Sequence, residues 1–137
     1  MRPPYQPDWK GLVSYPLPWW GLNASATWQN RPGPQQLASH VVTSSETTLN
    51  RPLTLNTATV NLITPGTMYG DRMNQMDVRV AKSVPIGKGR LQATMSLFNV
   101  FNSNATLTWS TRYGPTWLVP TSILQGRLVK FGAQLNF

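Results

Sequence analysis

The last segment of the chain, residues 127–137, alternates apolar residues with polar residues or Gly from Val129 to its end. Its apolar members stand at every second position: Val129, Phe131, Ala133, Leu135 and Phe137. Successive side chains of a β-strand point to opposite faces, so this spacing predicts a strand with one apolar and one polar face. Such a strand needs a sheet around it and an apolar medium beside it, which restricts the folds open to the chain.

The same alternation recurs in residues 20–30, 75–84 and 91–99, and more weakly in residues 10–15. Twelve Pro and ten Gly are spread along the chain and leave little room for long helices. The sequence therefore predicts an all-β fold with about five antiparallel strands. Residues 57–63 also alternate. We interpret them as part of a long loop, in a strand that extends above the membrane; the observations that indicate a membrane follow.

Polar residues of this chain are mostly uncharged. Charged residues make up 12% of the sequence, against roughly 25% in a typical soluble domain. Asn, Gln, Ser and Thr line a watery lumen without the cost of burying ions, and six Trp are many for so short a chain. Aromatic residues concentrate where a membrane meets water.

The predicted connections alternate in length. Short links at residues 16–18 and 85–90 alternate with long polar stretches at about 31–73 and 102–126. Short turns at one end and long loops at the other are typical of a transmembrane β-barrel with periplasmic turns and extracellular loops. About five strands amount to an incomplete barrel, because about eight are needed for closure.

Three groups of candidate site residues follow from this interpretation. The alternating carboxyl-terminal residues 129–137, which end in Phe, match the signal by which barrels are recognised for assembly. Trp19, Trp20 and Trp28 are candidate membrane-interface aromatics. The candidate lumen-facing residues are Asp77, Arg79, Lys130 and Gln134, whose charges are expected to pair with neighbouring strands or with a plug.

Enzymatic chemistry is not expected. The chain has no Cys, one His and four acidic residues, so we predict no metal site, cofactor or catalytic group. Gly87-Lys88-Gly89 lacks the spacing of a phosphate loop and is predicted to be a hairpin turn. The net charge of +8 comes from basic residues scattered singly, a distribution that does not favour nucleic acid as partner.

Neither a secretory signal nor a stretch of about 20 apolar residues is visible. If the chain crosses a membrane, it does so with strands. We therefore expect a fragment of a longer protein whose amino-terminal part is absent.

Four runs of sequence resemble the end of TonB-dependent receptors, most closely the large ones with an amino-terminal carboxypeptidase-regulatory-like domain. The runs are S-Y-P-L-P-W-W-G-L-N-A-S-A-T-W-Q-N-R-P-G-P-Q at 14–35, T-P-G-T-M-Y-G-D-R-M-N-Q-M-D-V-R-V-A-K at 64–82, S-L-F-N-V-F-N-S-N at 96–104 and I-L-Q-G-R-L-V-K-F-G-A-Q-L-N-F at 123–137. The similarity begins at about Lys10 and covers nearly the whole remaining chain. F-N-V-F-N at 98–102 matches a motif usual near the end of such barrels.

This resemblance implies a barrel of about 22 strands in the outer membrane of a Gram-negative bacterium, closed by an amino-terminal plug. The implied partners are outer-membrane lipid, the remaining strands and plug, the barrel assembly machinery, and the TonB complex through the plug alone. The chain departs from the family because it contains neither a plug nor enough strands for closure. We therefore predict a barrel segment for uptake of an unidentified substrate, not transport-competent alone. The alternative is a soluble or secreted β-sandwich that acts as a binding module.

Overall fold

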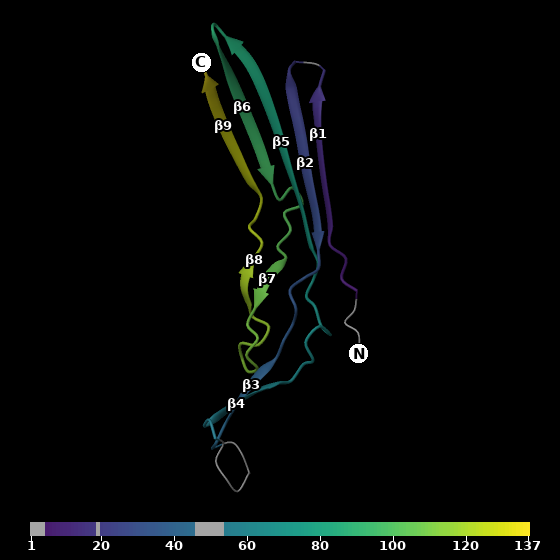
Figure 1. The fold of residues 1–137 in the computed structure, drawn as a ribbon, viewed down its shortest axis with the longest axis vertical. Helices are drawn as coiled ribbons and strands as arrows, with labels where there is room; N and C mark the ends of the chain where they lie inside the picture. Colours follow the sequence, from purple (N-terminus) through teal and green to yellow (C-terminus); the bar gives the residue numbers. More distant parts are fainter. Residues whose placement is uncertain (1–4, 19, 46–53) are drawn as a thin grey trace. The chain divides into compact units, whose positions relative to one another are not determined.

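A computed structural model of the chain describes residues 5–18, 20–45 and 54–137. Within these residues the fold is all-β with antiparallel pairing and no helix. Five strands form one sheet in the order β1-β2-β5-β6-β9 (Figure 1). They are β1 (Trp9–Leu17), β2 (Leu22–Arg31), β5 (Met73–Ile86), β6 (Gly89–Phe98) and β9 (Leu128–Asn136).

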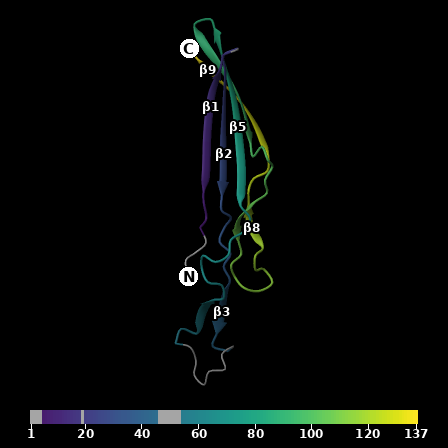
Figure 2. The ribbon, with the colours of Figure 1, turned by 90° about the vertical axis from the view of Figure 1, so that its right-hand side faces the viewer.

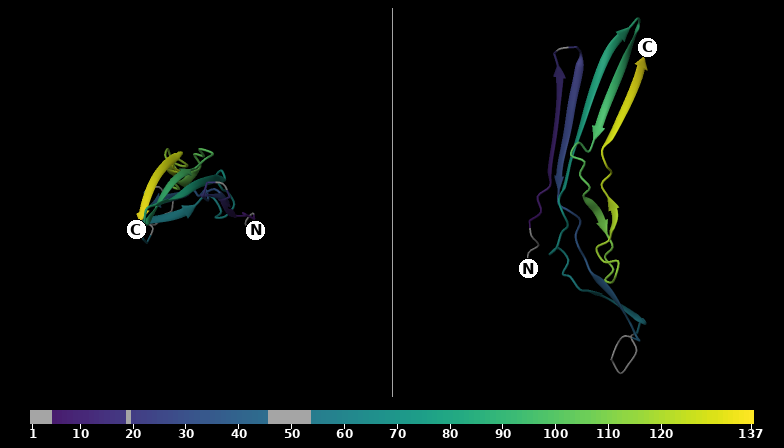
Figure 3. Two further views of the ribbon diagram at one scale, coloured as in Figure 1. Left: turned by 90° about the horizontal axis from the view of Figure 1, so that it is seen from above. Right: turned by 180° about the vertical axis from the view of Figure 1, so that it is seen from behind.

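The five segments predicted to alternate are the five strands of this sheet, so the all-β, antiparallel prediction is confirmed. The sheet is open, because β1 and β9 each pair with one neighbour and lie at opposite edges (Figure 3). The sheet is also twisted, and β9 crosses the direction of β1 when the ribbon is turned (Figure 2). Neither an incomplete barrel nor a closed one follows from the open sheet itself.

Both short links are hairpin turns, with bounds that differ from the prediction. β1 continues through Pro16 to Leu17, and in the turn before β2 Trp20 and Gly21 have φ of 69° and 62°. Trp20 was predicted as the first apolar residue of a strand, and the positive φ places it in the turn instead. The second turn is only Gly87-Lys88, flanked by the pair Ile86 and Gly89, and a positive φ of 57° at its first residue is the signature of a type II′ turn.

The two stretches predicted as loops contain four further short strands. β3 (Ser39–Thr43) pairs with β4 (Thr57–Asn61), and β7 (Thr106–Trp109) pairs with β8 (Pro120–Ile123). The interpretation of residues 57–63 as an extended part of a long loop agrees with β4, whereas β3, β7 and β8 were not predicted. These strands are four or five residues long, too short for alternation to distinguish them from loop.

The described residues divide into two compact units. The sheet unit contains β1, β2, β5, β6 and β9, and the loop unit contains β3, β4, β7 and β8. In the loop unit, the backbone of Ser39 donates to Thr111 O and accepts from Tyr113 N, each at 2.8 Å. Trp117 Nε1 donates to Leu37 O at 3.0 Å, and the nearby Ala38 is only 2% exposed. Trp109 lies so close to Gly70 that an added Cβ there would be 2.9 Å from the indole ring.

Buried apolar side chains are rare in this fold. Ala38, Met73 and Ala105 are the buried apolar residues among those that the structure describes. A soluble domain of this size normally buries a contiguous core of large side chains. The sheet unit is therefore held together by backbone hydrogen bonds and cross-strand pairs, while its faces stay open.

Candidate functional site

The register of the sheet sorts side chains into two faces. Residues paired directly across neighbouring strands lie on the same face, so each alternating row joins those of its neighbours. The row Ala26, Val78, Leu97 and Val129 is one example, and Ala24, Val80, Met95 and Phe131 is the next. We call this the apolar face. Its members are Val13, Tyr15, Leu17, Leu22, Ala24, Ala26, Trp28, Met76, Val78, Val80, Val84, Ile86, Leu91, Ala93, Met95, Leu97, Val129, Phe131, Ala133 and Leu135.

Several large side chains of the apolar face are exposed. Phe131 is 74% exposed, Val13 67% and Leu135 56%. One charged residue, Lys82, interrupts the face, where it pairs with Leu22 on one side and Ala93 on the other. A continuous apolar surface across five strands requires an apolar partner or an apolar medium.

The opposite face, here the polar face, carries hydroxyl, amide and charged groups. It comprises Lys10, Ser14, Asn23, Ser25, Thr27, Gln29, Arg31, Gln75, Asp77, Arg79, Ser83, Arg90, Gln92, Thr94, Ser96, Lys130, Gln134 and Asn136. All four candidate lumen-facing residues fall on it. Arg79 and Lys130 share one row with Ser96 between them, whereas Gln134 donates to Asn136 Oδ1 at 3.1 Å. The apolar side chains of Leu12, Phe98 and Leu128 also lie on this face.

Among the described residues, the carboxylate of Asp77 accepts hydrogen bonds and forms no ion pair. Its Oδ1 accepts from Gln75 Nε2 at 3.0 Å and from the backbone N–H of Asn99 at 2.8 Å. Within the described ranges the ion pairs found belong to Asp8, which lies 3.5 Å from Lys10 and 3.6 Å from Arg31. Within the described residues the carboxylate of Asp77 therefore anchors backbone, and charge pairing of this face with a plug stays a prediction.

Asn99, which donates its backbone N–H to Asp77, was not among the site residues predicted from the sequence. It is 2% exposed and has a φ of 51°. Its Nδ2 donates to Ser103 O and to Gln125 O, each at 2.8 Å, and its Oδ1 accepts from Ser103 N at 2.9 Å. The available signal was Asn directly after an alternating run, because Asn tolerates the left-handed conformation and bonds to nearby backbone.

A second Asn extends this connection to β9. Asn102, with a φ of 52°, accepts a 3.0 Å hydrogen bond from Arg127 N, and Arg127 Nη2 donates to Val100 O at 2.7 Å. Asn99 and Asn102 thus tie the end of β6 to the segment that leads into β9.

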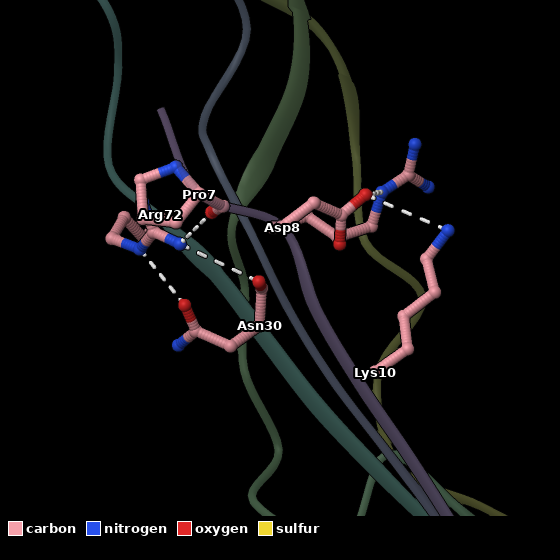
Figure 4. A network of polar contacts seen from close by, with 6 residues as sticks. Pro7, Asp8, Lys10, Asn30 and Arg72 are labelled. Atoms are coloured by element: carbon pink, nitrogen blue, oxygen red, sulfur yellow. Dashed lines mark hydrogen bonds and ion pairs between the residues drawn. The ribbon is translucent and has the colours of Figure 1, made fainter. Parts of the chain in front are cut away.

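The carboxyl-terminal end of β2 is held by a polar network (Figure 4). Arg72 donates from Nε to Asn30 Oδ1 at 2.8 Å and from Nη2 to Pro7 O at 2.6 Å. Asp8 and Lys10 lie in the same network. These contacts join the start of β1, the end of β2 and the start of β5, which are adjacent in the sheet.

The predicted interface aromatics do not gather in one place. Trp20 lies in the turn and is 81% exposed, whereas Trp28 lies toward the other end of β2 on the apolar face, where its Nε1 donates to Asn74 Oδ1 at 2.7 Å. Trp19 lies outside the described residues. All members of the predicted assembly signal, Val129 to Phe137, are exposed.

Metal-binding clusters of three or more His, Asp or Glu side chains are absent from residues 5–18, 20–45 and 54–137. In those ranges, no helix has the length and apolar character needed to cross a membrane. Comparison with protein-family models, with curated proteins and with solved structures finds no match to this chain. The candidate functional site is therefore the five-stranded sheet itself, with one apolar and one polar face.

Proposed function

We propose that the sheet unit is part of the wall of an outer-membrane β-barrel, from the carboxyl-terminal end of a TonB-dependent receptor. The apolar face contacts lipid, the polar face bounds the aqueous interior, and strands outside these residues complete the barrel. Its function is to contribute to uptake of a substrate across the outer membrane, without catalysis and without transport competence on its own.

The observation that carries this proposal is the apolar face itself. It continues in register over five strands with Lys82 as its one charged member, and many of its large side chains are exposed, Val13, Phe131 and Leu135 among them. Strand length supports the same reading, since β2 and β6 have ten residues each and β1 and β9 have nine. A tilted strand of about 9–11 residues spans the hydrocarbon layer of a bilayer.

Lys82 is compatible with this setting. It lies near the turn end of β5, opposite Leu22 at the first position of β2. A Lys close to the interface extends its long apolar stem through the hydrocarbon and places its ammonium group among the headgroups.

The open edges explain why the wall needs further strands. Every unpaired backbone group in lipid costs several kcal/mol, and only closure removes both edges of a sheet. The type of receptor rests on the resemblance of residues 14–35, 64–82, 96–104 and 123–137.

The alternative, a soluble or secreted β-sandwich, needs a second layer packed about 10 Å from the apolar face. The short strands β3, β4, β7 and β8 pair only in twos, and large side chains of the apolar face remain exposed. The membrane proposal accounts for this exposure, whereas a sandwich does not.

The absence of native Cys allows a direct test with single-cysteine variants of the full chain at positions 129–136. Each variant carries an environment-sensitive fluorophore and is reconstituted into phosphatidylcholine vesicles. We expect positions 129, 131, 133 and 135 to be quenched by a lipid-soluble quencher and the intervening positions by a water-soluble one. A chain that is monodisperse in buffer without detergent, with the first set shielded from both quenchers, is a sandwich, and the proposal then fails.

A further inference from the structure

Arg79 occupies the middle strand of the polar face. Its row crosses all five strands through Ser14, Ser25, Ser96 and Lys130. Three hydroxyl groups and two cations therefore stand in one line, and the row contains no acidic residue. Unlike the basic residues near Asp8, Arg79 lies in the middle strand of the sheet, and Lys130 lies in the edge strand β9.

The acidic residue closest along the strand forms no ion pair with Arg79 in the described part of the chain. Asp77 lies two positions away on the same face, but its carboxylate is engaged by Gln75 Nε2 and by the backbone of Asn99. The ion pairs in the described part of the chain belong to Asp8. The guanidinium of Arg79 thus meets no carboxylate within residues 5–18, 20–45 and 54–137.

Two hollows of the polar face share the side chains of Ser25 and Arg79. One has a volume of about 220 Å³ and is also lined by Thr27, Asp77, Val78, Ser96 and Phe98. The other has a volume of about 260 Å³ and is also lined by Ser14, Asn23, Ala81 and Gln92. The second hollow combines a guanidinium with hydroxyl and amide groups and has no acidic lining residue.

Lys130 adds a second cation on the far side of Ser96. Strands in a sheet are about 4.8 Å apart, so the Cα atoms of Arg79 and Lys130 are separated by about 10 Å. Both side chains are long, and the Ser96 hydroxyl lies between them in register. An anion above Ser96 is therefore within reach of both.

We propose that the Arg79 row is a binding site for an oxyanion, the carboxylate or phosphate group of a small solute. A guanidinium binds such groups with two parallel hydrogen bonds, and flanking hydroxyls and amides supply further donors. The inference rests on the proposed function for its setting, because there the polar face bounds the route that a solute takes.

The test uses the full chain, labelled with ¹⁵N and folded in detergent micelles, with sodium acetate and inorganic phosphate as separate probes. NMR spectra follow the Nε–Hε signal of Arg79 and the backbone amides of Ser25 and Ser96. Sodium chloride at matched ionic strength serves as the control for screening. We expect saturable shifts with at least one probe, and the comparison of the two shows whether carboxylate or phosphate is preferred.

Two charge-removing variants separate a built site from general attraction. Arg79→Gln should weaken the binding of the probe about tenfold or more, because the bidentate contact is lost. Arg90→Gln removes the same charge from the same face, at a residue paired with Asn136 near the end of the sheet, and should leave binding within about twofold.

Shifts that do not saturate, or that the two variants reduce equally, would overturn the proposal. If the chain is monodisperse in buffer without detergent, the same titration is carried out in that buffer. Solubility without detergent would contradict the proposed membrane function. The oxyanion site is then judged separately, by whether the shifts saturate and whether Arg79→Gln weakens them more than Arg90→Gln.

Discussion

The backbone N–H of Asn99 donates a 2.8 Å hydrogen bond to the carboxylate of Asp77, 22 residues earlier in the chain. Asp77 is in β5, and Asn99 directly follows β6. The bond therefore joins two neighbouring strands at the point where the chain leaves the sheet, and the buried Asn99 passes the connection on to Gln125.

Removing this acceptor should destabilise the sheet. Asp77→Ala leaves a buried N–H without a partner, which costs about 1–3 kcal/mol. Asp77→Asn keeps an acceptor oxygen and should lose less. Urea unfolding of the full chain in micelles measures the free energies. Asp71→Asn, at an exposed residue outside the strands, serves as the control, and an equal loss in Asp71→Asn and Asp77→Ala would contradict the assigned role.

Two substitutions at Asn99 separate its backbone from its side chain. Asn99→Gly keeps the left-handed φ but removes three side-chain hydrogen bonds, at about 1 kcal/mol for each. Asn99→Ala also strains the backbone and should unfold at a free energy about 1–2 kcal/mol lower again. The same urea experiment ranks them, and an Ala variant as stable as the Gly variant would refute the φ argument.

A cation on the apolar face should hinder insertion. Val78→Lys places an ammonium group in the middle of that face, at a cost of about 2–4 kcal/mol in lipid. Ala81→Lys adds the same group to the same strand on the polar face, where water receives it. Refolding yield in phosphatidylcholine vesicles is the readout. Equal yields for the two variants would remove the lipid assignment of the face.

Phe137 offers a test of recognition without a stability effect. It is fully exposed, at 104% of the reference value, and contributes no packing within the chain. Phe137→Ser should leave the urea midpoint unchanged and slow assembly by purified barrel assembly machinery in proteoliposomes. Phe101→Ser, at another exposed Phe, is the matched control, and unchanged assembly kinetics of Phe137→Ser would exclude the carboxyl-terminal signal.

The two glycines around the second hairpin should respond differently to Ala. A Cβ at Gly89 would be 2.5 Å from Asn136 O, which is backbone, whereas Gly87 has open space and only a φ of 57° to oppose substitution. We expect about 1–2 kcal/mol for Gly87→Ala and a larger loss for Gly89→Ala, because the end of β9 must move. Thermal unfolding by circular dichroism compares them, and the reverse order would show that the β6–β9 register is wrong.

The sequence by itself determined which residues share a face. Alternation is a local property with a period of two. Residues 127–137 therefore predict an apolar row at 129–135 whichever strands pair with them. For the same reason the segments 20–30, 75–84 and 91–99 were found with nearly correct bounds. The all-β fold and the membership of Asp77, Arg79, Lys130 and Gln134 on one polar face follow from that periodicity.

The tertiary structure alone decided how the rows meet. Register joins Arg79 to Ser96 and Lys130, and it depends on pairings between strands that are distant in sequence. The engagement of Asp77 by Asn99 is likewise a long-range contact, invisible to a pattern that considers charge and period only. The short strands β3, β7 and β8 escaped prediction because four or five residues carry too few alternations, and their pairing is fixed by backbone partners far along the chain.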